Sequence, residues 1–140
     1  MSKPRRMKYE LLCLLATFVM NVGAQRNPSI SFISKQRVVN IGDTLELKCQ
    51  VQDAENYPVA WTKLGRDQHG QIFISKGKTI TLPSTRHHIR YEDSDSTYTL
   101  VIEKIQEIDV GTYRCEITTG VNTNVSICLF VCLLFANHDS

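Results

Sequence analysis

Alternation of apolar and polar side chains runs through residues 29–131 and predicts β-strands. In the segment TLELKCQV, residues 44–51, apolar side chains at every second position alternate with Glu46, Lys48 and Gln50. Successive side chains of a strand point to opposite faces of a sheet. The segment is therefore expected to form a half-buried antiparallel strand, with one face against a core and the other in water.

Similar short segments follow along the chain and are separated by turn residues. The predicted strands are YPVAWTKL at 57–64, QIFISK at 71–76, HHIRY at 87–91, STYTLVIEKI at 96–105 and GTYRCEITTG at 111–120. The segments GRDQHG and EDSDS between them are polar turns. No convincing amphipathic helix and no internal repeat is present in the sequence. The pattern predicts an all-β antiparallel sandwich.

The N-terminal residues 1–24 have the pattern of a secretory signal peptide. A basic start precedes the short apolar run LLCLLATFVM, and small residues lead to a cleavage site after Ala24. Removing this segment, which carries a net charge of +3, from a chain of net charge +2 leaves a charge of about −1. Because no basic stripe remains, nucleic acid is excluded as a partner.

Four cysteines remain in the mature chain, where an oxidising secretory compartment allows disulfides to persist. They are Cys49, Cys115, Cys128 and Cys132, and they permit three full pairings. Cys49 and Cys115 both lie mid-strand on inward faces, 66 positions apart, and Trp61 follows Cys49 by 12. This is the arrangement of an immunoglobulin domain of variable or intermediate type, in which one disulfide bridges two sheets against an indole.

The stretch DVGTYRC, residues 109–115, fits the same fold. Asp109, Gly111, Tyr113 and Cys115 alternate, so they share one face or its approach. Tyr113 lies two residues before the second cysteine, as in a tyrosine corner, whose hydroxyl bonds to the backbone upstream. In variable-type domains an arginine at the start of the fourth strand pairs with the acid; Arg86 matches, and Arg90 is the alternative. The expected core comprises Leu47, Trp61, Leu100, Ile102 and Tyr113.

The segments ISFISKQRVVNIGDTLELKCQVQDAENYPVAWTK and YEDSDSTYTLVIEKIQEIDVGTYRCEI resemble the first domain of the lachesin family. These insect surface immunoglobulin proteins are related to amalgam and to the neuronal IgLON group. The resemblance covers residues 30–126. It implies an extracellular or cell-surface adhesion module that binds itself or related immunoglobulin-superfamily proteins. It also implies a longer protein with several such domains, often held at the membrane by a lipid anchor.

The expected binding face comes from strands near residues 61–64, 71–75 and 114–118. Its candidate outward residues are Thr62, Ile72, Arg114 and Glu116. No catalytic template fits the sequence, so we expect no enzyme, no cofactor and no small-molecule substrate. The adjacent histidines His87 and His88 would face opposite sides of a strand, and EDSDS lacks the ligand spacing of a calcium loop, so no metal site is expected.

The resemblance ends after Ser126, where the chain continues as ICLFVCLLFANHDS. Inward positions remain apolar at 125, 127, 129 and 131, but the outward positions Cys128, Phe130 and Cys132 are no longer polar. We assign residues 25–132 to the domain and 133–140 to a short tail. A transmembrane helix, a lipid-anchor signal and a cross-linking strand are less favoured explanations than a truncated or alternatively spliced product.

Three further expectations concern this region. A spliced or truncated form would act as a soluble ligand or decoy, or it would be a non-functional product that aggregates through its last strand. A glycosylation sequon lies at Asn124, at the entry to the last strand. The similar sequence at Asn27 is disqualified by its proline. Cys128 or Cys132 could form a bridge to another chain.

Overall fold

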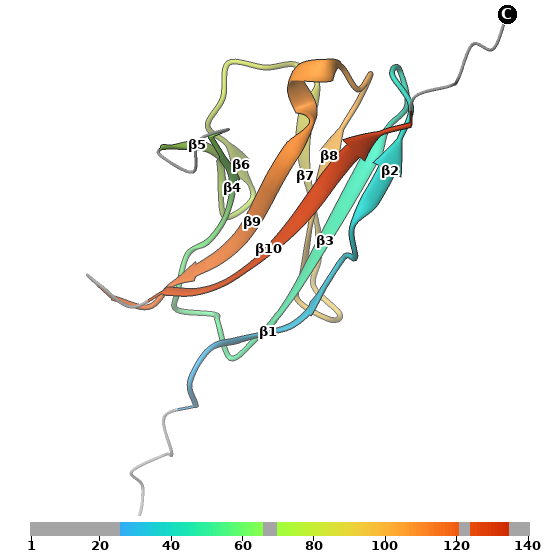
Figure 1. The fold of residues 1–140 in the computed structure, drawn as a ribbon. Coiled ribbons are helices and arrows are strands. Elements are labelled where there is room, and N and C mark those ends of the chain that lie inside the picture. The colour runs from blue at the N-terminus through green and yellow to red at the C-terminus, as the bar shows by residue number, and fades with distance from the viewer. Residues whose placement is uncertain (1–25, 66–69, 121–123, 135–140) are drawn as a thin grey trace, which may run out of the picture.

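The computed structural model describes residues 26–65, 70–120 and 124–134, which form two β-sheets (Figure 1). The first sheet has the order β1–β3–β8–β7, with the bounds β1 Ser29–Ile33, β3 Leu45–Gln52, β8 Thr97–Ile102 and β7 His87–Glu92. The second has the order β2–β10–β9–β4–β5–β6, with the bounds β2 Arg37–Val39, β10 Asn124–Leu133, β9 Gly111–Thr118, β4 Val59–Leu64, β5 Gln71–Lys76 and β6 Thr79–Ile80.

The predicted signal peptide lies outside the described residues, as do the side chains of Asn124 and Cys128. In the part of the chain that the structure describes, no helix has the length and hydrophobicity needed to cross a membrane.

The strands β3 and β9 show why the alternating pattern produces this fold. Every second residue of β3 is buried, beginning with Leu45 and ending with Val51. The same holds in β9 for Tyr113, Cys115 and Ile117. One face of each sheet therefore consists of apolar side chains that can be removed from water only by packing against the other sheet.

The centre of the sandwich holds the disulfide and the tryptophan that the spacing predicts. Cys49 is bonded to Cys115. Trp61 is 1% exposed, and its Nε1 donates a hydrogen bond to the carbonyl oxygen of Tyr98 at 3.3 Å. The indole thus buries a large apolar surface without leaving its N–H unpaired. The other expected core residues, Leu47, Leu100 and Ile102, are fully buried.

The chain changes sheets at Ser34, between β1 and β2. The Ser34 amide donates to the carbonyl oxygen of Lys48 at 2.9 Å, and the Ser34 hydroxyl accepts from the Lys48 amide at 2.8 Å. These two bonds fasten the end of β1 to β3. Past this point β2 runs parallel to the end of β10, pairing Arg37–Val39 with residues 131–133.

The last strand, β10, pairs with β9 over residues 124–131 (Figure 1). Leu129, Val131 and Leu133 are buried, so β10 includes one residue that we assigned to the tail. Ile127 lies opposite the inward-pointing Cys115, as the alternation predicts, but 37% of its surface is exposed. Since β2 covers only residues 131–133, the first part of β10 has no neighbouring strand on its outer side. Among described side chains, Cys132 is half-buried and outside any disulfide.

Candidate binding face

Strand β9 has one side in the core and the other on the surface. Tyr113 and Cys115 point inward and are buried, whereas Arg114 and Glu116 alternate with them and point outward. The inward residues anchor the strand through the disulfide and the tyrosine hydroxyl. The outward residues are therefore presented from a rigid central strand, which favours a defined binding geometry.

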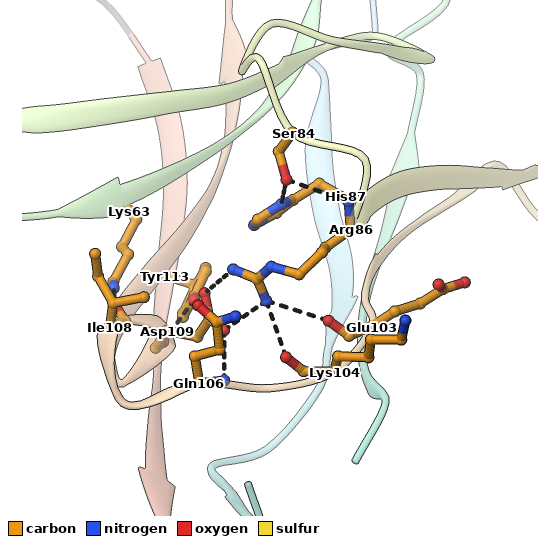
Figure 2. A network of polar contacts seen from close by, with 10 residues as sticks. All are labelled: Lys63, Ser84, Arg86, His87, Glu103, Lys104, Gln106, Ile108, Asp109 and Tyr113. Carbon is orange, nitrogen blue, oxygen red and sulfur yellow. Dashed lines mark hydrogen bonds and ion pairs between the residues drawn. The ribbon is translucent and has the colours of Figure 1, made fainter. Parts of the chain in front are cut away.

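The start of β9 is fixed by a network of polar contacts shown in Figure 2. Arg86 Nη1 donates to Asp109 Oδ2 at 2.8 Å, and Nη2 donates to Oδ1 at 3.1 Å. The same Nη1 also reaches the carbonyl oxygens of Glu103 and Lys104, at 3.1 and 3.2 Å. Of the two predicted partners for Asp109, the structure thus selects Arg86. Arg90 instead pairs with Glu46 on the surface.

Asp109 belongs to a short 3-10 helix, Glu107–Asp109, so it lies on the approach to β9. The Tyr113 hydroxyl donates to the Asp109 carbonyl oxygen at 2.6 Å, which forms the predicted tyrosine corner. Burial acts to raise the pKa of Asp109, but hydrogen bonds from Arg86 and the Gln106 amide outweigh it and lower the pKa below its ordinary value. Burial raises the pKa of Tyr113, so the hydroxyl remains a donor.

The adjacent histidines have separate surroundings. His87 Nδ1 lies 2.7 Å from the Ser84 hydroxyl, and burial, with the charge of Arg86, lowers the pKa of His87. His88 is exposed, and its Nε2 lies 3.5 Å from a Glu103 carboxylate oxygen. Within the described ranges, no group of three or more histidine, cysteine or acidic side chains could hold a metal ion.

The strand register identifies which residues share the outward side of the second sheet. Thr62 of β4 lies opposite Arg114 of β9 and Phe73 of β5. Ala60 lies opposite Glu116 and Lys76 in the same way, and Thr112 lies opposite Phe130 of β10. Directly opposed residues of paired strands point to the same face. We name this surface the β9 face and define it by Ala60, Thr62, Phe73, Lys76, Thr112, Arg114, Glu116 and Phe130.

Two aromatic side chains stand out on the β9 face. Phe73 is 55% exposed and Phe130 is 43% exposed, from strands on either side of β9 and β4. Between them Arg114 and Glu116 form a long ion pair, with 3.9 Å separating Arg114 Nη1 from Glu116 Oε2. Arg114 Nε is buried and has no hydrogen-bond partner among the described residues. The face thus combines exposed aromatic side chains with a guanidinium whose Nε–H has no hydrogen-bond partner among the described residues.

Two of the predicted outward residues need correction. Thr62 does lie on the β9 face, but its side chain is fully buried, because it is short and stands between the longer side chains of Arg114 and Phe73. Ile72 is 50% exposed but lies opposite Lys63, which in turn lies opposite the inward-pointing Tyr113. Ile72 is therefore on the other side of the strand from Arg114.

The residue that the sequence analysis missed is Phe73. Ile72 and Ile74 are two positions apart and share a side, but only the structure shows that Ile74 is buried in the core. The aromatic residue between them must then point outward. A register shift between Trp61 and Thr62 disturbs the pairing of β4 with β5. The alternation in β4 therefore does not predict which residues of β5 point outward.

The outward side of the first sheet is different in character. Arg90 makes two hydrogen bonds to the Glu46 carboxylate, at 3.0 and 2.9 Å, and lies 3.7 Å from Glu92. Lys48 and His88 complete a charged surface around the buried Thr99. We name this surface the β8 face and define it by Glu46, Lys48, His88, Arg90, Glu92 and Thr99.

Comparison with known proteins places this architecture in a family. Residues 28–130 match the immunoglobulin I-set domain. The chain is 40% identical over 121 residues to lachesin of Schistocerca americana and 41% identical over 113 residues to lachesin of Drosophila melanogaster. These matches cover 86% and 81% of this chain, and 35% and 31% of the two relatives. The chain therefore spans about a third of the length of the lachesins it matches.

Protein amalgam of Drosophila melanogaster is 28% identical over 104 residues, covering 71% of this chain and 31% of its own. A crystal structure of Dpr1 IG1 bound to DIP-eta IG1 matches with a TM-score of 0.64 at 26% identity, covering 77% of this chain and 97% of that chain. A complex of Dpr2 Ig1-Ig2 with DIP-Theta Ig1-Ig3 matches with a TM-score of 0.66 at 20% identity, covering 81% of this chain and 50% of that one. The predicted fold and the predicted likeness to lachesin are thereby confirmed. The chain belongs to the immunoglobulin I-set family and is a lachesin-like member of the immunoglobulin superfamily.

Proposed function

We propose that this domain is an extracellular recognition module that binds another immunoglobulin domain through the β9 face. The observation that carries the proposal is the exposure of Phe73, an aromatic side chain 55% accessible to solvent in the same row as Thr62 and Arg114. Exposed aromatic and arginine side chains are the residue types that most often dominate the energy of a protein interface.

The relatives support this choice of partner. One similar structure, 26% identical to this chain, is a complex of one immunoglobulin domain with another. A sheet face with a few apolar anchors suits weak contacts that gain strength from many copies on opposed cell surfaces. We therefore propose a role in cell-surface adhesion through contacts with the same chain or with related proteins, and binding rather than catalysis.

The proposal is tested with the full chain expressed for secretion in insect cells. We expect it to bind at least one immobilised immunoglobulin domain from a panel of related proteins that includes the chain itself. Phe73→Asp should abolish this binding, because a carboxylate replaces the apolar anchor. A matched control is Phe32→Asp on β1, since Phe32 is 49% exposed but belongs to the other sheet. Absence of binding across the panel, or equal binding by Phe73→Asp, would overturn the proposal.

We further propose that the chain passes through the secretory pathway and carries a glycan on Asn124. Ser126, the third residue of the sequon, is exposed on β10, which supports this proposal. N-terminal sequencing of the secreted protein should begin at Gln25. Treatment with an N-glycosidase should shift the wild-type band, and Asn124→Gln should remove the shift. An unshifted wild-type band would refute the glycan.

A further inference from the structure

The outer edge of β10 is open along its first part, where no described strand lies beside residues 124–130 (Figure 1). We propose that this edge pairs with the same edge of a second copy of the chain, antiparallel and about a twofold axis at Ser126, so that their two second sheets become one. The pairing uses the backbone of β10 rather than the β9 face, so it does not depend on the proposed function.

The contact between β10 and β2 shows which backbone groups of β10 point to its outer side. The Leu134 amide donates to the carbonyl oxygen of Val39 at 2.8 Å, so Leu134 directs its N–H toward β2. These directions alternate along a strand, and β10 pairs with β9 without a register shift. Asn124, Ser126 and Cys128 therefore direct both their N–H and C=O groups to the same outer side, where β2 does not reach.

This edge lacks the features that protect the other sheet edges. Edge strands usually avoid pairing with other chains through charges, prolines, bulges or short length. The edge strand β1 has a register shift between Ile30 and Phe32, β7 carries several charged residues, and β6 and β2 have two and three residues. Residues 124–130 of β10, NVSICLF, contain no charge, no proline and no bulge. The open part of β10 is therefore the edge of this domain best suited to accept a strand.

The free backbone groups match those of a second copy when Ser126 lies opposite Ser126. In this register the backbone of Asn124 lies opposite that of Cys128 in the second copy, and the reverse pair occurs by symmetry. Each of these opposed pairs exchanges two backbone hydrogen bonds, so all the free groups of the three residues are satisfied. Phe130 stays outside the ladder, because β2 begins beside it, with Arg37 opposite Val131.

The side chains between these backbone pairs favour the same register. Ile127 is on the inward side of β10 but remains 37% exposed, and Val125 on the same side is half-buried. With Ser126 on the axis, Ile127 lies opposite Val125 of the second copy, and this apolar pair occurs twice. The pairing therefore removes from water an inward-facing side chain that the single domain leaves uncovered. No charged residues are opposed, because residues 124–130 contain none.

The symmetry of this pairing limits it to two copies. Each chain has one open stretch on β10, and the pairing uses it completely, so the assembly closes as a dimer. A twofold axis between antiparallel strands of one sheet is perpendicular to that sheet, so both copies turn the β9 face to the same side. Two recognition surfaces side by side would strengthen weak contacts with an opposed cell surface. This last consequence rests on the proposed function, whereas the pairing itself does not.

The test uses the full chain with Phe73→Asp, Cys128→Ser and Cys132→Ser in every sample, so that neither the β9 face nor a native thiol can produce dimers. Sedimentation velocity over a range of concentrations should show a reversible dimer that grows no further. Ser126→Pro removes the N–H at the centre of the ladder and should weaken the dimer at least about tenfold. Ser126→Ala is the matched control, because it removes the same hydroxyl and the same sequon but keeps the N–H, and its dimer should persist.

Cross-linking tests the register and gives a result even if Ser126→Pro fails to fold. Val125→Cys and Ile127→Cys are introduced into separate chains of the same background, which are mixed and oxidised mildly. Opposed residues at such a position have Cα atoms about 4.5 Å apart, within the range of a disulfide. The mixture should therefore form cross-linked dimers at least about fivefold faster than either variant alone, since each cysteine then faces the other rather than an apolar side chain.

Several results would overturn the inference. They are a monomeric Ser126→Ala chain, a Ser126→Pro dimer of unchanged strength, open-ended aggregates in place of a dimer, and equal cross-linking by the mixture and by the separate variants. None of these results bears on the proposed function, because binding to the panel of immunoglobulin domains is measured with Phe73 intact. Conversely, absence of binding across that panel would leave a dimer of the Phe73→Asp chain unaffected.

Discussion

The two outward faces of the sandwich are built on the same plan but differ in how their charges are used. Each has a fully buried threonine on a central strand, Thr62 on the β9 face and Thr99 on the β8 face. On the β8 face the surrounding charges hold one another, as Arg90 and Glu46 do through two short bonds. On the β9 face the surroundings include the exposed Phe73 instead.

This difference supports the proposed choice of the β9 face for recognition. A surface whose charges are already paired and hydrated gains little when a partner covers it, because it loses water without gaining new bonds. A surface with exposed aromatic groups and an incompletely bonded arginine gains both apolar burial and hydrogen bonds. Fold alone would not distinguish the two faces, since both are outward sides of sheets in one domain.

The largest expected effect comes from a substitution in the core that supports both faces. Trp61→Ala deletes the indole that packs between the sheets, and we expect the free energy of unfolding to fall by about 3–5 kcal/mol. Because the two faces share one core, binding and overall structure should be lost together. Denaturant unfolding followed by circular dichroism measures this. An unchanged midpoint would mean that Trp61 is not the central packing residue.

The next effect acts on the anchor of β9. Asp109→Asn leaves the Arg86 guanidinium, 22% exposed, without its charged partner, and we expect a loss of about 3 kcal/mol. The pH dependence follows from the lowered pKa of Asp109. The ionised carboxylate stabilises the fold above its ordinary pKa of 3.8, and this contribution disappears as pH falls through the lower folded value.

The measurement for Asp109 is a series of melting temperatures at decreasing pH. The wild-type melting temperature should fall steeply as the pH drops below the ordinary pKa of 3.8, and the Asn variant should show a shallower fall from a lower starting value. Equal slopes in the two proteins would show that other carboxylates control acid unfolding.

A smaller effect is expected at Gly111, where β9 begins. Its φ is +144°, a conformation that side chains rarely adopt, and an added Cβ would lie 3.1 Å from Lys63 Cε. Gly111→Ala should therefore cost about 1–3 kcal/mol and shift the start of β9. Since β9 contributes to only one face, the change should weaken binding more than it disturbs the β8 face. Amide hydrogen exchange resolves this: protection should drop in β9 while β7 and β8 keep theirs.

The features that were predictable from sequence depend on alternation within one strand. In β3 and β9 the core positions, including Cys49 and Cys115, follow directly from residues two apart. The sequence favoured Arg86 over Arg90 as the partner of Asp109 because of its place at the start of the fourth strand, and the structure has this pair. Only Arg86 lies beside Asp109, at the start of β7.

The features that were not predictable depend on neighbouring strands. Thr62 is buried by residues of β5 and β9 that are distant in sequence, so its own pattern does not reveal its exposure. Ile127 is exposed because β2 is too short to cover it. Phe73, rather than Ile72, lies on the β9 face because the register shift after Trp61 changes the pairing between β5 and β4. Contacts with neighbouring strands, rather than alternation within one strand, determine all three.

The smallest expected effect tests whether the buried threonines contribute to the difference between the faces. The hydroxyls of Thr62 and Thr99 have no hydrogen-bond partner among the described residues. Valine has the same shape without the hydroxyl, so Thr62→Val and Thr99→Val should each be neutral or stabilising by up to about 1 kcal/mol. Binding should be unchanged in both, because the exposed side chains of Phe73 and Arg114 distinguish the faces. If Thr62→Val alone weakened binding, the Thr62 hydroxyl would have to become accessible in the complex, and binding would include a rearrangement of β4.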